Sequence, residues 1–90
     1  MAIVDLGQEY VKAADAADDV VTIQVQTEPG MEVIFSAGGL PAVTEAGLKV
    51  PCFDGVTRGG GLGHAGHIYV RAWRLPGGPV REGLAVSVIG

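Results

Sequence analysis

Residues 20–26 read VVTIQVQ, and this alternation decides the fold class. Val21, Ile23 and Val25 point to one side of an extended chain, and the polar residues between them point to the other. A period of two is typical of a β-strand with one buried and one exposed side. Similar stretches predict strands at residues 9–14, 31–37, 67–75 and 83–89. The chain is therefore expected to be all-β, either a small antiparallel β-sandwich or a partly open barrel, since five short strands fit both.

The segments on either side of residues 20–26 are less regular. Residues 6–17 also contain alanines near helical spacing, but we favour a strand at residues 9–14, followed by an acidic turn, because the strand at 20–26 needs a neighbour. Glu28-Pro29-Gly30 is expected to form a tight turn that makes residues 31–37 the hairpin partner of residues 20–26.

The alternation also predicts which side chains face the core. In residues 31–37, Val33 and Phe35 are expected to face the core. The side chains expected to face outward are Glu32, Ile34 and Ser36. In the last strand we expect three inward residues: Leu84, Val86 and Val88.

Residues 38–66 are rich in glycine and proline and are expected to form a long central loop. Within them, Leu48-Lys49-Val50 is a candidate edge strand that ends at Pro51, because proline cannot donate to a strand ladder. A loop of this length in a small domain is often functional or ordered by a partner.

The composition predicts one domain, residues 1–90, with an apolar surface. Hydrophobic residues make up 48% of the chain, charged residues only 18%, and the mean hydropathy is +0.36. Surplus apolar surface favours a subunit interface and a homo-oligomer. The net charge of −4 with only six basic residues argues against nucleic-acid binding.

The charges are unevenly distributed along the chain. Residues 1–45 carry eight acidic residues and one lysine, whereas residues 46–90 carry five basic and two acidic residues. Two arrangements are open: interleaved strands mix these charges in space, or the charges stay segregated and favour head-to-tail contacts.

Nothing in the sequence indicates secretion or a membrane span. Cys52 is the single cysteine, so no internal disulfide is expected, which fits folding under reducing conditions. Residues 1–7 lack the basic start of a signal peptide, and no apolar stretch is long enough to cross a bilayer.

Three groups of residues have types that could carry chemistry, but none has the pattern of a known site. His64, His67, Cys52 and Asp54 have types that suit zinc, but Cys52 lacks a second nearby cysteine. The glycines at residues 59–63 lack the following Lys-Ser/Thr of a phosphate-binding loop. Cys52 and a histidine match no nucleophile motif. We therefore expect no catalytic residue, metal or cofactor.

Binding is the better supported role. Tyr69, Arg71 and Trp73 share one side of the strand at 67–75, and aromatic residues and arginine are enriched at binding hot spots. With Ile34 and Arg74 they form the candidate interface. The alternative, that Trp73 belongs to the core, remains open.

The chain resembles small virion proteins of tailed bacteriophages. The resemblance lies in AIVDLGQEYV at residues 2–11, the polar-faced strand at 20–26, the glycine-rich centre and IYVRAW at residues 68–73. It implies a capsid decoration or cement protein that binds the lattice of the major capsid protein, or a head–tail or tail accessory subunit. It also implies a location in the virion, after assembly in the host cytoplasm, and it supplies no catalytic residues.

Two classes of function follow from these observations. The first is a non-enzymatic assembly subunit of the virion, and the second is a soluble β-sandwich module that binds a sugar or a receptor. Self-association or lattice binding favours the first, and binding of an isolated glycan favours the second.

Overall fold

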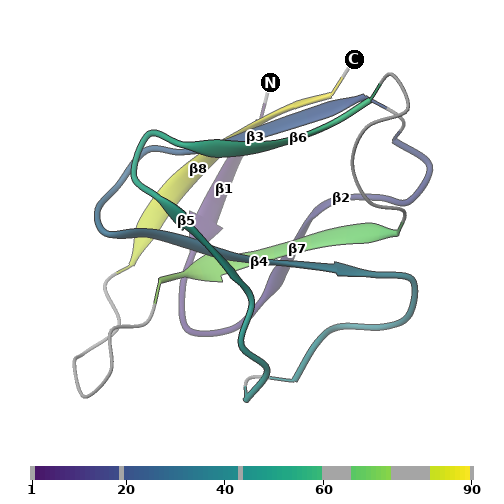
Figure 1. The fold of residues 1–90 in the computed structure, drawn as a ribbon, viewed down its shortest axis with the longest axis horizontal. Helices are drawn as coiled ribbons and strands as arrows, with labels where there is room; N and C mark the ends of the chain where they lie inside the picture. Colours follow the sequence, from purple (N-terminus) through teal and green to yellow (C-terminus); the bar gives the residue numbers. More distant parts are fainter. Residues whose placement is uncertain (1, 19, 43, 60–65, 74–81, 90) are drawn as a thin grey trace.

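Two antiparallel sheets of four strands each form the protein, which is described here by a computed structural model (Figure 1). The structure describes residues 2–18, 20–42, 44–59, 66–73 and 82–89. Its strands are β1 (Ala2–Leu6), β2 (Val11–Ala14), β3 (Val21–Val25), β4 (Gly30–Ser36), β5 (Leu48–Pro51), β6 (Gly55–Arg58), β7 (His67–Ala72) and β8 (Gly83–Ile89).

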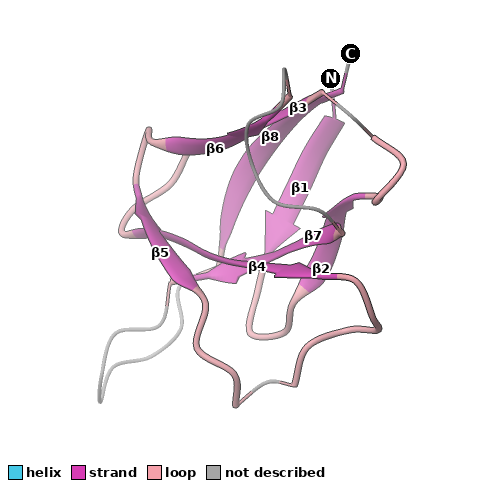
Figure 2. Cartoon of the chain, turned by 45° about the vertical axis from the view of Figure 1, so that its right-hand side comes forward, coloured by secondary structure: helices cyan, strands magenta, loops and turns pink. Residues whose placement is uncertain are grey.

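The two sheets pack face to face as a sandwich. Sheet A has the order β1-β8-β3-β6, and sheet B has the order β2-β7-β4-β5. Figure 2 shows the chain crossing between the layers at one side, where β5 leads into β6. The all-β fold is therefore confirmed, with separate sheets that fit an open sandwich better than a barrel. The described residues contain no apolar helix of bilayer-spanning length.

The five predicted strands are all present, and residues 9–14 contain a strand, β2, and no helix. Three further strands complete the sheets. β5 is an edge strand that includes the candidate at residues 48–50, whereas β1 and β6 were not expected. Residues 38–66 are thus divided by β5 and β6, and the glycines at 60–63 together with His64 lie outside the described residues.

The expected hairpin between residues 20–26 and 31–37 is wrong. β3 pairs with β6 and β8, and β4 pairs with β5 and β7, so the chain crosses from sheet A to sheet B between them. β3 and β4 each have one strongly apolar side. Because the two strands belong to different sheets, both apolar sides are buried in the core between the sheets. At the crossing, Gly30 has a φ of +143°, and a Cβ there would lie 2.1 Å from the carbonyl oxygen of Val50.

The expected orientation of β8 is also wrong. Ala85 and Ser87 are buried, whereas Leu84 is 40% and Val88 is 48% exposed. The register explains this difference, because β8 places Ala85 beside Val25 of β3, whose side chain is fully buried. A shift of one residue would reverse every side chain of the strand, so β3 fixes which side of β8 faces inward.

The core lies between the sheets and matches the predicted pattern elsewhere. Val33 is buried as expected, and Phe35 is partly buried against the core. The fully or nearly fully buried aliphatic side chains are Leu6, Val21, Ile23, Val25, Met31, Val33, Ile68 and Val70.

Candidate functional site

The predicted interface residues lie on the outer face of sheet B. Ile34 pairs with Tyr69 across β4 and β7, and Arg71 is two residues further along the same face. Trp73 follows β7 directly, and its backbone N–H donates to the carbonyl of Gly30. The alternation therefore grouped these four residues correctly. Arg74 lies outside the described residues.

Part of this face is covered by the chain itself. The Tyr10 hydroxyl and the Arg71 guanidinium both donate to the carbonyl oxygen of Glu45, each at 2.8 Å. Tyr69 is only 6% and Arg71 only 3% exposed, so these two side chains offer a partner little surface. The expectation that Tyr69 and Arg71 belong to an exposed interface is therefore wrong. Ile34 and Trp73 are partly exposed.

Arg71 forms a buried ion pair that the sequence did not reveal. Its Nε lies 3.1 Å from Oε2 of Glu32, whose other oxygen lies 3.2 Å from Nζ of Lys49. Burial raises the pKa of Glu32, but hydrogen bonds from Arg71 and Lys49 outweigh it and leave the pKa below its ordinary value. Glu32 lies on the outer face of β4, as predicted, but it is buried there because residues after 37 cover this side of the strand.

The aromatic neighbour of this pair completes the cluster. The Arg71 guanidinium lies 4.2 Å from the ring centroid of Tyr10, a cation–π geometry. Lys49 similarly approaches the ring of Trp73 at 5.7 Å. The ion pairs of Glu32 with Arg71 and Lys49, together with the contact of Tyr10 with Arg71, join residues of the acidic first half to residues of the basic second half. The strands therefore mix the charges at this cluster, as the first of the two open arrangements predicted.

The candidates for metal binding and nucleophilic chemistry are not brought together. Cys52 lies in the turn after β5, where its N–H donates to Pro29 at the start of β4. His67 pairs with Ser36 at the opposite end of β4, roughly 20 Å away at about 3.3 Å per residue. Among the described residues, no three His, Cys, Asp or Glu side chains form a group that could hold a metal ion.

His67 instead takes part in a local hydrogen-bonded cluster. Its Nδ1 accepts the N–H of Ala16 at 3.0 Å and lies 3.5 Å from Asp15. The adjacent Arg58 is buried and donates to the backbone carbonyls of Asp15, Asp18 and Gly66. The pKa of Asp15 is lowered by its hydrogen bond and ion pair with Lys12. This cluster anchors the chain around β2 and β6.

The outer face of sheet A is apolar along β1 and β8, and we call it the β1–β8 face. It consists of Ile3, which is 70% exposed, with Val86 beside it in register, and of Leu84 and Val88; the exposed Asp5, beside Leu84, is its one charged residue on these two strands. Thr57 of β6 lies on the same face at the far edge of the sheet. The sequence pattern contained the apolar residues of β8 but assigned them to the core.

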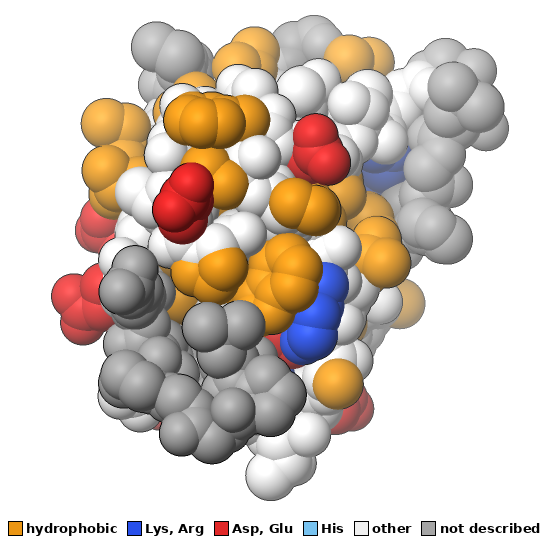
Figure 3. Space-filling model, turned by 60° about the vertical axis from the view of Figure 1, so that its left-hand side comes forward, with side chains coloured by type: hydrophobic (Ala, Val, Ile, Leu, Met, Phe, Trp, Pro, Cys, Tyr) orange, Lys and Arg blue, Asp and Glu red, His pale blue; other side chains and the backbone are white. Residues whose placement is uncertain are grey.

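A second exposed apolar group lies where β5 turns into β6. Phe53 is 65% exposed and has a φ of +69°, a left-handed conformation that costs a non-glycine residue roughly 1–2 kcal/mol. It is held there because its N–H donates to Val25 and its carbonyl accepts from Gln24. Figure 3 looks toward this end of the sandwich and shows hydrophobic side chains gathered among acidic ones.

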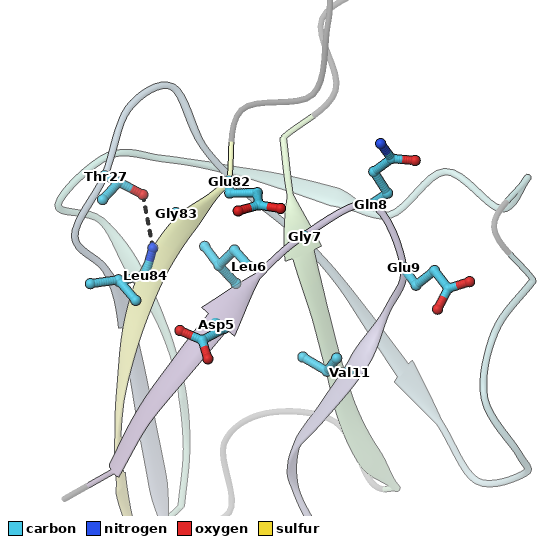
Figure 4. Close-up of a pocket in the computed structure, with 10 residues that line it drawn as sticks. All are labelled: Asp5, Leu6, Gly7, Gln8, Glu9, Val11, Thr27, Glu82, Gly83 and Leu84. Atoms are coloured by element: carbon cyan, nitrogen blue, oxygen red, sulfur yellow. Dashed lines mark hydrogen bonds between the residues drawn. The ribbon is translucent and has the colours of Figure 1, made fainter.

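An open pocket lies near the first turn of the chain and the start of β8 (Figure 4). It is a shallow hollow, widely open to solvent, with a volume of about 910 Å³, and it is lined by Asp5, Leu6, Gly7, Gln8, Glu9, Val11, Thr27, Glu82, Gly83 and Leu84. One lining contact is a hydrogen bond of 3.0 Å from the N–H of Leu84 to the Thr27 hydroxyl. Among the described residues that line it, three are carboxylates (Asp5, Glu9 and Glu82) and none is basic, so this part of the pocket suits a positively charged group.

Comparison of the chain with protein-family models, with curated proteins and with solved structures finds no match. The functional interpretation therefore depends on the surfaces described above.

Proposed function

We propose that this protein is a non-enzymatic structural subunit of a virion, most specifically a decoration or cement protein that binds the lattice of the major capsid protein. The observation that carries this proposal is the β1–β8 face. Ile3, Leu84 and Val88 are exposed together on one sheet face, and an exposed apolar patch of this kind is typical of an interaction site. A partner that covers these side chains removes their apolar area from water, which stabilises the complex.

Two features support the mode of binding. The face is part of a regular sheet, and the main chain of Phe53 is held by hydrogen bonds with the Val25 carbonyl and the Gln24 side chain, so binding would order little backbone. A subunit that binds the assembled shell and not its free components stabilises the shell by mass action. No covalent chemistry is needed for this role. A head–tail or tail accessory subunit would use the same surface on a different virion component.

The proposal is tested by co-sedimentation with empty shells of the major capsid protein encoded in the same genome. Wild-type protein is expected to sediment with the shells and to saturate. Val88→Lys places a charge in the β1–β8 face and is expected to weaken binding at least about tenfold, because burying an unpaired ammonium group is costly. The matched control is Thr57→Lys, which adds the same charge to an exposed polar position of the same sheet.

A second variant tests the aromatic contact. Phe53→Asn removes the exposed ring but keeps a residue that tolerates a positive φ, so the fold should be retained. Weaker binding to shells is expected. Shell binding that is equal for wild type, Val88→Lys and Phe53→Asn would contradict the proposal.

The open pocket is the observation that favours the alternative, a soluble binding module. Its volume suits a small ligand, and its three carboxylates can accept hydrogen bonds from hydroxyl or ammonium groups. Binding of an isolated glycan, abolished by Glu82→Gln and retained in Val88→Lys, would favour this function over shell binding.

A further inference from the structure

Each sheet of the sandwich has two edge strands, and three of these four edges carry features that prevent pairing with another chain. β2 contains Lys12 and an irregular register between Lys12 and Ala14. β5 contains Lys49 and Pro51, and β6 has only four residues and an inward arginine, Arg58. Lysine, proline, bulges, short strands and inward charges are the usual means by which edges avoid added strands.

The edge of β1 carries fewer of these features, and its one charged residue is the exposed Asp5. Its five residues pair with β8 in an unbroken register, and the strand contains no lysine, arginine, proline or glycine. Within the described residues β1 pairs with β8 alone. The strand is also well exposed, with Ile3 70% accessible. An edge of this kind presents unpaired backbone groups to any extended chain that approaches it.

We infer that the β1 edge pairs with the β1 edge of a second copy of this chain, in antiparallel orientation around a two-fold axis. Such pairing would extend sheet A from four to eight strands. The edge complements itself, because an isologous contact needs only one unprotected strand. This inference concerns self-association and does not depend on the proposed virion function.

The alternation of side chains restricts the register. Residues that oppose each other in an antiparallel pair point to the same side of the sheet, so Ile3 and Asp5, both outward, must meet outward residues. The register that pairs all five residues places Ile3 opposite Asp5 of the second copy and Val4 opposite Val4. No like charges are then directly opposite, and the apolar β1–β8 faces of both copies join on one side of the extended sheet.

The size of the contact sets its strength. A five-residue strand is about 17 Å long at roughly 3.4 Å per residue, and two sheets about 10 Å apart with their side chains are roughly 20–25 Å thick. The contact would therefore bury on the order of 400 Å² per copy, about half of a standard interface. We expect a reversible dimer that becomes visible at micromolar to millimolar concentrations.

Sedimentation equilibrium across this concentration range tests the inference, with charge variants that report the register. Ile3→Lys would place a lysine opposite Asp5, and Ile3→Glu would place a like charge there. Because symmetry doubles each pair, the Glu variant is expected to dimerise at least about fivefold more weakly than the Lys variant. The matched pair Val88→Lys and Val88→Glu lies on the same face but not on the edge, so the sign of its charge should matter little.

A second measurement needs no variant. Amide hydrogen exchange of the wild-type protein is expected to slow in β1 as concentration rises, while the edges β2, β5 and β6 stay unchanged. The inference is overturned by a monomer at all concentrations with constant β1 exchange. It is also overturned by dimerisation that does not distinguish Ile3→Lys from Ile3→Glu.

Discussion

Replacing Glu32 by glutamine removes the negative partner of the buried ion pair and leaves Arg71 charged in a site where it is only 3% exposed. The variant keeps the shape of the side chain, so the change isolates the charge. Arg71 would keep its contacts with the Glu45 carbonyl and the Tyr10 ring but would lose its ion pair with Glu32. Leaving one charge of a buried pair without its partner costs about 3–5 kcal/mol.

This loss is large for a chain of 90 residues. At about 0.05–0.15 kcal/mol per residue, the free energy of unfolding is about 5–13 kcal/mol. Glu32→Gln should therefore remove a quarter or more of the stability. For a domain of this size about 4–8 °C of melting temperature is lost per kcal/mol, so a decrease of at least about 12 °C is expected.

The assay is urea denaturation followed by far-ultraviolet circular dichroism and by the fluorescence of Trp73, the single tryptophan. The control is Lys49→Gln, because Lys49 bonds the same carboxylate but its side chain is 43% exposed. An exposed ion-pair partner contributes about 0–1 kcal/mol. The double variant Glu32→Leu/Arg71→Met removes both charges and should be more stable than Glu32→Gln alone. A loss below about 1 kcal/mol in Glu32→Gln, or an equal loss in Lys49→Gln, would refute the reasoning.

Three further predictions concern the acid dependence of stability, the glycine at position 30 and the orientation of β8. Because the pKa of Glu32 in the folded protein is below its ordinary value of 4.5, the stabilisation that Glu32 gives is present above pH 4.5 and is lost as the pH falls through the folded pKa. The free energy of unfolding should therefore fall more steeply with acid in wild type than in Glu32→Gln. Gly30→Ala should lower the free energy of unfolding by more than about 2 kcal/mol, because the added Cβ meets the Val50 carbonyl, whereas the Cβ of Gly39→Ala would have no atom within 4 Å. Equal melting temperatures of the two variants would contradict this. Ala85→Lys should prevent folding because Ala85 is buried, whereas Val88→Lys, at an exposed position, should change the free energy of unfolding by less than about 1 kcal/mol. Circular dichroism that shows a folded Ala85→Lys and an unfolded Val88→Lys would place Val88 inward.

The sequence predicted the strands well where alternation was strong. Residues 20–26 predicted β3 with the correct inward side, because valine and isoleucine at every second position place all the apolar side chains on one side of the strand. β1 was missed because AIVDL is short and lacks regular alternation, which an edge strand does not need. β6 was missed because Gly55 and the polar residues around it resemble a loop, and its strand geometry comes from pairing with β3.

The positions of the functional surfaces were harder to predict, because they depend on contacts between distant segments. Tyr69 and Arg71 were correctly placed on one side of β7, but their burial comes from residues near Glu45, which no local pattern reveals. The orientation of β8 depends on its register with β3, and two apolar residues of the exposed face, Leu84 and Val88, were for that reason assigned to the core. Local periodicity identifies a face, and tertiary pairing decides whether that face is covered.

The central claim, that the β1–β8 face binds a capsid lattice, is tested most directly by electron cryomicroscopy of empty shells incubated with saturating protein. We expect added density at repeated lattice positions, with Ile3, Leu84 and Val88 facing the shell. Shells without added density, or protein bound with this face toward solvent, would contradict it.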